Sequence, residues 1–207
     1  MMTRIVACWL TVAVCGLCGT AYGASTTVAG FDDGSNDGFT GNAFFDATGG
    51  NPGGNANHLA QFMQFVSLRT GGVGEPSNPN FLGDYSSFDS ATFSFDIRVD
   101  TLASFNGPIS RDIGIALIDR DIQGSSGPSG VFFTLATMNE SIQDDWTSLS
   151  VTIDDPTSAT LPAGWIGFGD ESPTFEPILP AGATFASVLA SVDEFQITGA
   201  VPGFFFN

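Results

Sequence analysis

Ala91-Thr-Phe-Ser-Phe-Asp-Ile-Arg-Val-Asp100 is the stretch of the sequence that decides the fold. Its apolar residues Phe93, Phe95, Ile97 and Val99 alternate with polar or charged ones. Successive side chains of a strand point to opposite faces, so this alternation predicts a strand with one apolar and one polar face. Sheets of such strands are antiparallel and cover their apolar face with a second layer. The stretch therefore predicts a two-layered antiparallel protein.

Short segments of the same kind, separated by turn residues, recur along the chain. One helix is expected from Thr184 to Val192, with Thr184 as its N-cap and Phe185, Val188 and Leu189 on one face. Many short strands with almost no helix predict an all-β fold, an antiparallel β-sandwich of jelly-roll type with one short helix near the C-terminus. Further strands are expected at residues 26–31, 39–46, 59–68, 112–118, 131–136, 148–153 and 193–198.

The first 23 residues have the order of a secretory signal peptide. A positive start ending at Arg4 precedes an apolar run over residues 5–17, and the small residues Ala21 and Gly23 stand at the two positions that a signal peptidase reads before a cut after Gly23. The run is too short for a membrane span. We therefore expect a signal peptide at residues 1–23, one domain at residues 24–207, secretion, and no membrane insertion of the mature chain. All three cysteines lie within the signal, so the mature chain is expected to fold without disulfides.

The charge of the chain excludes several classes of partner. It has 22 acidic residues and five basic ones, all of them arginine, which gives a formal net charge of −17. Such a surface repels nucleic acid and anionic lipid, so neither is expected as a partner. It favours solubility and weak binding of cations.

Three motifs resemble the laminin B (laminin type IV) domain of bacterial secreted proteins. They are Asn51-Pro52-Gly53-Gly54, Phe81-Leu82-Gly83-Asp84 and the strand around Phe93-Ser94-Phe95-Asp96. The resemblance covers roughly residues 28–207 and implies an extracellular jelly-roll module without enzymatic activity. The sequence departs from that pattern at Phe204-Phe205-Phe206-Asn207, where such a domain usually continues, so the last strand is expected to be incomplete.

A cluster of oxygen-bearing side chains, Asp32, Asp33, Asn36 and Asp37, is the best candidate for a metal site. Calcium prefers such ligands, and in a jelly roll Asp193 of the closing strand could join them. The prediction is a structural calcium held by Asp32, Asp33, Asp37 and Asp193. The alternative is ordinary turn chemistry, for which Asp, Asn and Gly are the usual residues.

Tyr85, Trp146 and Trp165 are the candidates for a ligand-binding surface, because their rings combine a stacking face with a polar atom. The alternative is that both tryptophans belong to the core, since large aromatic residues are highly buried on average. These residues lead us to expect a non-catalytic module that binds a polysaccharide or an extracellular protein.

A carbohydrate-active enzyme with acids from separate loops is the second hypothesis. Adjacent acids such as Asp144 and Asp145 point to opposite faces of a strand and make no catalytic pair. His58 lies in no recognisable nucleophile motif and is expected to be a structural residue beside a turn. A concave pocket with two facing carboxylates would favour the enzyme.

Overall fold

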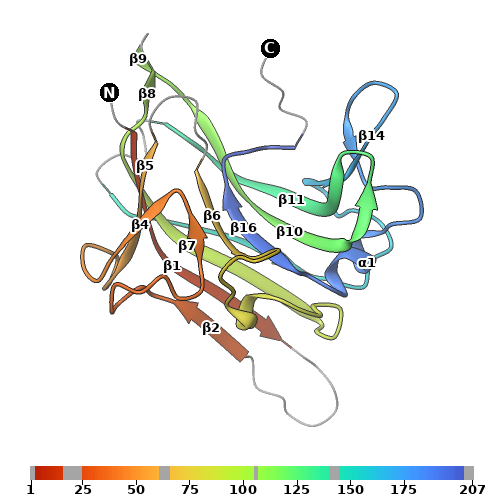
Figure 1. Cartoon of the computed structure of the whole chain (residues 1–207), viewed down its shortest axis with the longest axis horizontal. Coiled ribbons are helices and arrows are strands. Elements are labelled where there is room, and N and C mark those ends of the chain that lie inside the picture. The colour runs from red at the N-terminus through yellow and green to blue at the C-terminus, as the bar shows by residue number, and fades with distance from the viewer. Residues whose placement is uncertain (1–2, 16–24, 61–65, 105–106, 140–144, 203–207) are drawn as a thin grey trace.

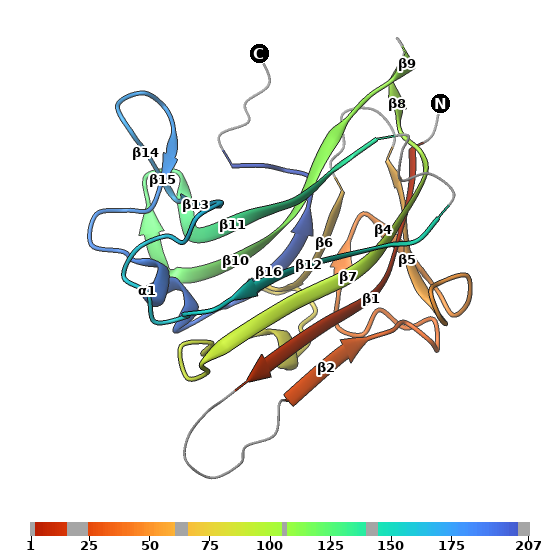
Figure 2. The same ribbon diagram turned by 180° about the vertical axis from the view of Figure 1, so that it is seen from behind.

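The computed structural model describes residues 3–15, 25–60, 66–104, 107–139 and 145–202, and its strands form an all-β sandwich (Figures 1 and 2). One layer, sheet A, has the order β12-β7-β1-β5-β4, with β2 also paired to β1. The other layer, sheet B, has the order β13-β11-β10-β16-β6-β3. The chain crosses repeatedly between the two layers, as a jelly-roll fold requires.

The strands of sheet A are β1 (Thr3–Cys15), β2 (Ser25–Ala29), β4 (Ala43–Asp46), β5 (Asn55–Ala60), β7 (Ser90–Thr101) and β12 (Thr147–Ile153). Those of sheet B are β3 (Thr40–Gly41), β6 (Ser67–Gly71), β10 (Arg111–Gly124), β11 (Gly127–Met138), β13 (Trp165–Phe168) and β16 (Glu194–Thr198). Two small hairpins pair β8 (Ala103–Ser104) with β9 (Gly107–Pro108), and β14 (Asp170–Glu171) with β15 (Pro177–Ile178). The helical elements are η1 (Pro79–Phe81) and α1 (Phe185–Leu189).

The core lies between the sheets and is rich in phenylalanine. In β7, Phe93, Phe95, Ile97 and Val99 are all buried, which confirms the alternation predicted from the sequence. The ring of Phe93 stacks on that of Phe195 from β16, with 5.5 Å between their centres. This contact joins the two layers near the middle of the sandwich.

The predicted helix and most of the predicted strands are confirmed, but the strand expected at residues 39–46 is two strands, β3 in sheet B and β4 in sheet A. Thr184 caps α1 by accepting a hydrogen bond from the Ser187 amide, and Phe185, Val188 and Leu189 are buried. The strand expected at residues 59–68 is wrong, because β5 ends at Ala60 in sheet A and β6 begins at Ser67 in sheet B. Residues 61–65 lie outside the described part of the chain. The apolar run therefore spans a change of sheet, which periodicity alone does not reveal.

The segment expected to be a signal peptide contributes β1. This strand lies inside sheet A, between β5 and β7, and is antiparallel to both (Figure 2). The boundary expected after Gly23 stays a prediction, because residues 16–24 lie outside the described part of the chain. Of the helices in the described residues, none has the length and apolar character needed to cross a bilayer.

Candidate binding pocket on the outer face of sheet B

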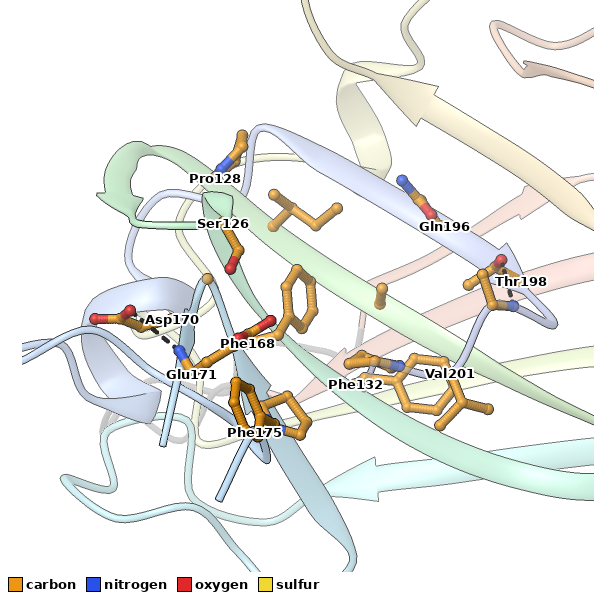
Figure 3. Close-up of a pocket in the computed structure, with 16 residues that line it drawn as sticks. Ser126, Pro128, Phe132, Phe168, Asp170, Glu171, Phe175, Gln196, Thr198 and Val201 are labelled. Atoms are coloured by element: carbon orange, nitrogen blue, oxygen red, sulfur yellow. Dashed lines mark hydrogen bonds between the residues drawn. The ribbon is translucent and has the colours of Figure 1, made fainter. Parts of the chain in front are cut away.

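A cavity of about 340 Å³ opens on the face of sheet B that points away from sheet A (Figure 3). On β10, Ile115 and Leu117 point into the core, so Ala116 and Ile118 point outward and form part of the cavity floor. The outer face of β10 was not predicted to be buried. It is covered because segments distant in sequence, β13 to β15 and residues 200–202, fold over it.

Two phenylalanine rings complete the floor, and each lies over a glycine. A Cβ atom added to Gly130 would lie 2.4 Å from Cζ of Phe168, and one added to Gly114 would lie 2.6 Å from Cζ of Phe132. Real Cβ atoms do not tolerate such distances, so these two glycines let the rings approach the sheet backbone. The sequence signal is a glycine at an outward-facing strand position with a phenylalanine nearby in the ladder.

Phe175 stands at the rim of the pocket and is 75% exposed (Figure 3). Its backbone has φ of 64°, a left-handed conformation that is rare for a bulky residue. The turn that holds it is internally bonded, because the Phe175 amide donates to the Ser172 carbonyl and the Ser172 amide donates to the Glu176 carbonyl. Uncommon backbone conformations of this kind cluster at functional sites, which makes Phe175 a candidate for one.

The polar groups of the pocket are mainly hydrogen-bond acceptors. The Ser125 hydroxyl donates to the Asp170 carboxylate, and with the Glu171 amide it lowers the pKa of Asp170. Asp170 is therefore ionised at neutral pH. Glu171 is exposed beside it. On the opposite side Gln196 and Thr198 of β16 face the pocket (Figure 3).

The three aromatic residues proposed as a binding surface do not line this pocket. Tyr85 is 4% exposed, and its hydroxyl donates to the Phe81 carbonyl at 3.0 Å; burial raises its pKa. Trp165 is 7% exposed. Neither ring offers a free stacking face. Trp146 is half-buried, with the Arg98 guanidinium 5.1 Å from its ring centre, so it alone of the three keeps some exposed surface.

Three of the proposed calcium ligands accept hydrogen bonds from backbone amides, of their own turn or, for Asp32, of a distant one. Asp37 accepts from the amides of Gly30 and Phe31, and Asp32 accepts from the Gly54 amide at 3.0 Å. Asp33 accepts from the Ser35 amide, and the side chain and amide of Ser35 lower its pKa. These contacts are those of the alternative interpretation, turn chemistry.

Asp193, the fourth proposed ligand, lies with other carboxylates. Ligand oxygens of Asp119, Asp121 and Asp193 lie within 4.8 Å of one another, and among the described residues this is the group with the spacing of a cation site. Asp119 also accepts from the amides of Asp121 and Ile122, and Asp193 accepts from the Arg120 amide. Sequence reasoning missed Asp119 and Asp121 because β10 meets the start of β16 only in the folded chain.

His58 is buried inside β5, not in a turn. Its Nδ1 lies 2.6 Å from the Asn42 carbonyl oxygen, to which it donates, and Nε2 has no hydrogen-bond partner. Burial lowers the pKa of the ring. A buried imidazole bonded to a main-chain carbonyl is a structural group, as expected.

Known proteins give no guide to this pocket. No family model matches the chain, and neither the curated proteins nor the solved structures compared with it include a match. The resemblance to the laminin B domain therefore stays an expectation from the sequence.

Proposed function

We propose that the chain is a secreted, non-catalytic module that binds a carbohydrate of the cell surface or extracellular matrix in the pocket on sheet B. The observation that carries the proposal is the exposed ring of Phe175 beside a cavity floored by Phe132 and Phe168. An exposed aromatic ring next to an apolar floor suits the C–H face of a sugar. A pocket of this size with a few polar groups at its edge is the usual form of a small-ligand site.

The polar groups at the rim indicate which carbohydrates fit. Ionised Asp170 and the neighbouring Glu171 accept hydrogen bonds from hydroxyl groups, and Gln196 can both donate and accept. Acidic polysaccharides are disfavoured, because the chain carries a net charge of −17 and its pocket rim is itself acidic. The proposed ligand is therefore a neutral polysaccharide.

The carboxylates of the pocket favour binding over hydrolysis. Glycosidases place two carboxyl groups about 5 to 9.5 Å apart across the bond that they cleave, and one of them has a raised pKa. Asp170 and Glu171 are adjacent on β14, where successive side chains diverge, and the pKa of Asp170 is lowered. A lowered pKa makes Asp170 a poor proton donor at neutral pH.

Secretion and a structural calcium remain part of the proposal. The signal-like order of residues 1–23 supports secretion. The Asp119, Asp121 and Asp193 carboxylates offer the hard oxygen atoms that calcium prefers.

The test is binding of the secreted protein to neutral and acidic polysaccharides, followed by titration calorimetry on the best ligand. We expect neutral glycans to bind and Phe175→Asn to weaken the affinity about tenfold, or about 1.4 kcal/mol. Asparagine is chosen because it tolerates the left-handed backbone conformation.

The matched control is Phe44→Asn, which removes a 65% exposed phenylalanine from β4 in the other sheet. Equal losses in the two variants, or no neutral glycan bound, would contradict the proposal. Release of new reducing ends from the bound glycan would establish the enzyme instead.

A further inference from the structure

Strand β1 fills a central position of sheet A. It forms 11 registered pairs with β7 and five with β5. Because β1 is antiparallel to both neighbours, β5 and β7 are parallel to each other and do not pair in the described residues. Each has its other edge occupied, β7 by β12 and β5 by β4. The space for β1 is therefore a slot that β7 borders along residues 4–15 of β1, and that β5 borders on the other side along residues 3–7.

The sequence of β1 matches the residues that it faces in register. Leu10 pairs with Phe95, Val12 with Phe93 and Val14 with Ala91, and these partners on β7 are buried. Towards the start of the strand, Ile5 pairs with Val99 and Ala7 with Ile97. The slot thus favours an extended segment with apolar residues at alternate positions.

Removal of residues 1–23, on which the proposed secretion rests, would empty this slot. The facing edges of β5 and β7 would then carry unpaired amide and carbonyl groups, which is the condition under which sheets recruit another strand. The core residues of β7 would also lose the neighbour that pairs with them.

A second copy of the chain offers no suitable donor among its described strands. The slot needs a segment that is free on both edges and covers about the 11 positions of β7 that pair with β1. Strand β2 pairs with β1 alone and would be released with it, but it has only five residues. The other strands of both sheets are held by neighbours that remain after cleavage.

We infer that the mature protein binds an extended segment of another protein in this slot, antiparallel to β5 and β7. The donor carries apolar residues at the positions that pair with the core residues of β7. In β1 these positions are Ile5 and Ala7 before the register shift between Cys8 and Leu10, and Leu10, Val12 and Val14 after it. The donor's backbone bonds to β7 along its length and to β5 over five positions, which gives affinity, while the apolar positions fix the register.

The experiment uses the chain from Ala24 to Asn207, produced directly, so its outcome does not depend on cleavage of the leader or on glycan binding. The probe is a synthetic peptide of residues 3–15 with both cysteines replaced by serine. The control peptide also carries Leu10→Asp and Val12→Asp, which put charges at positions paired with Phe95 and Phe93. We expect the first peptide to bind at least tenfold more tightly than the control.

Two further readouts identify the place of binding. Hydrogen exchange is expected to slow in β5 and β7 on peptide binding, and to stay unchanged in the hairpin of β10 and β11. The full chain, residues 1–207, is expected not to bind the peptide, because its slot is filled. If the mature chain folds only when the peptide is added, the proposal is also supported.

Several outcomes would overturn the inference. Equal affinity for the two peptides, or protection elsewhere, would mean that the slot closes or that binding is nonspecific. A stable dimer that excludes the peptide would identify a second copy as the occupant. If a mature chain shortened to end at Pro202 binds the peptide more tightly than the one ending at Asn207 does, the chain's own C-terminal residues are the occupant of the slot. Failure to fold with the peptide, while the full chain folds, would show that β1 must be covalently attached.

Discussion

His58 is the single histidine of the chain, and its burial makes the stability of the fold depend on pH in mild acid. The folded pKa is lowered, so the unfolded chain, with a histidine pKa of about 6.5, takes up the proton more readily. The stability due to the neutral ring is complete above pH of about 6.5 and is lost as the pH falls from there towards the folded pKa. We expect the urea midpoint to drop between pH of about 7.5 and about 5.5.

The variant His58→Asn tests this assignment. Its amide keeps a donor for the Asn42 carbonyl but cannot titrate, so its urea midpoint is expected to change less over the same interval. Charge repulsion among the acidic residues changes with pH in both proteins and is removed by comparing them. Parallel curves for the two proteins would show that the ring does not titrate differently in the folded state.

Residue types in the sequence predicted the core but not the contacts of individual polar groups. Alternation identifies Phe93 and Ile97 as buried because the pattern of a strand is local. The acidic cluster at residues 32–37 could equally bind a cation or its own turn, and the difference lies in where each carboxylate oxygen points. Tyr85 shows the same limit, since its hydroxyl reaches a main-chain carbonyl inside the core.

Strand β7 organises the sandwich, and a substitution of its buried residue Phe93 tests that role. Phe93 is fully buried and contacts the rings of Phe195 and Tyr85, at 5.5 and 5.4 Å between centres. We expect Phe93→Ala to lower the free energy of unfolding by about 3–5 kcal/mol, because it leaves a cavity between the sheets. Urea denaturation of the purified protein measures the change.

The matched substitution is Phe44→Ala on β4, where the ring is 65% exposed. A change within about 0.5 kcal/mol is expected there. If both substitutions lowered the free energy of unfolding by similar amounts, Phe93 of β7 would not be a core residue between the sheets.

Elements were predictable where their pattern is local, and less so where distant segments cover them. The helix α1 was predictable from its N-cap residue, Thr184, and from the spacing of its apolar residues. Strand β10 instead is buried on both faces, and its outer cover comes from residues about 50 to 80 positions further along the chain. The pocket was therefore not predictable from the pattern of β10.

Because the whole molecule is acidic, calcium could bind in two ways, diffusely to the surface or at a specific site, and salt distinguishes them. Diffuse attraction to a surface of net charge −17 is screened at about 150 mM salt, whereas a site of fixed ligands keeps its affinity. At that salt concentration we expect calcium to raise the melting temperature more than magnesium does, because the unfolded chain cannot assemble the site. Each 1 kcal/mol gained corresponds to about 2–4 °C for a chain of this size.

Two substitutions distinguish the carboxylate groups. Asp121→Asn, at an exposed position of the Asp119, Asp121 and Asp193 group, is expected to abolish the calcium-dependent increase. Asp33→Asn, in the turn cluster, is expected to retain it. The reverse result would assign the ion to the cluster at residues 32–37, and identical shifts for calcium and magnesium would leave no site at either place.

The absence of lysine has a practical consequence for the molecule as a whole. Because all five basic residues are arginine, the only primary amine of the polypeptide is its α-amino group. In the mature chain that group would precede β2, and no residue of β2 lines the pocket on sheet B. Amine-reactive coupling would therefore attach every molecule to a sensor surface through one point, which lies outside the residues that line the pocket.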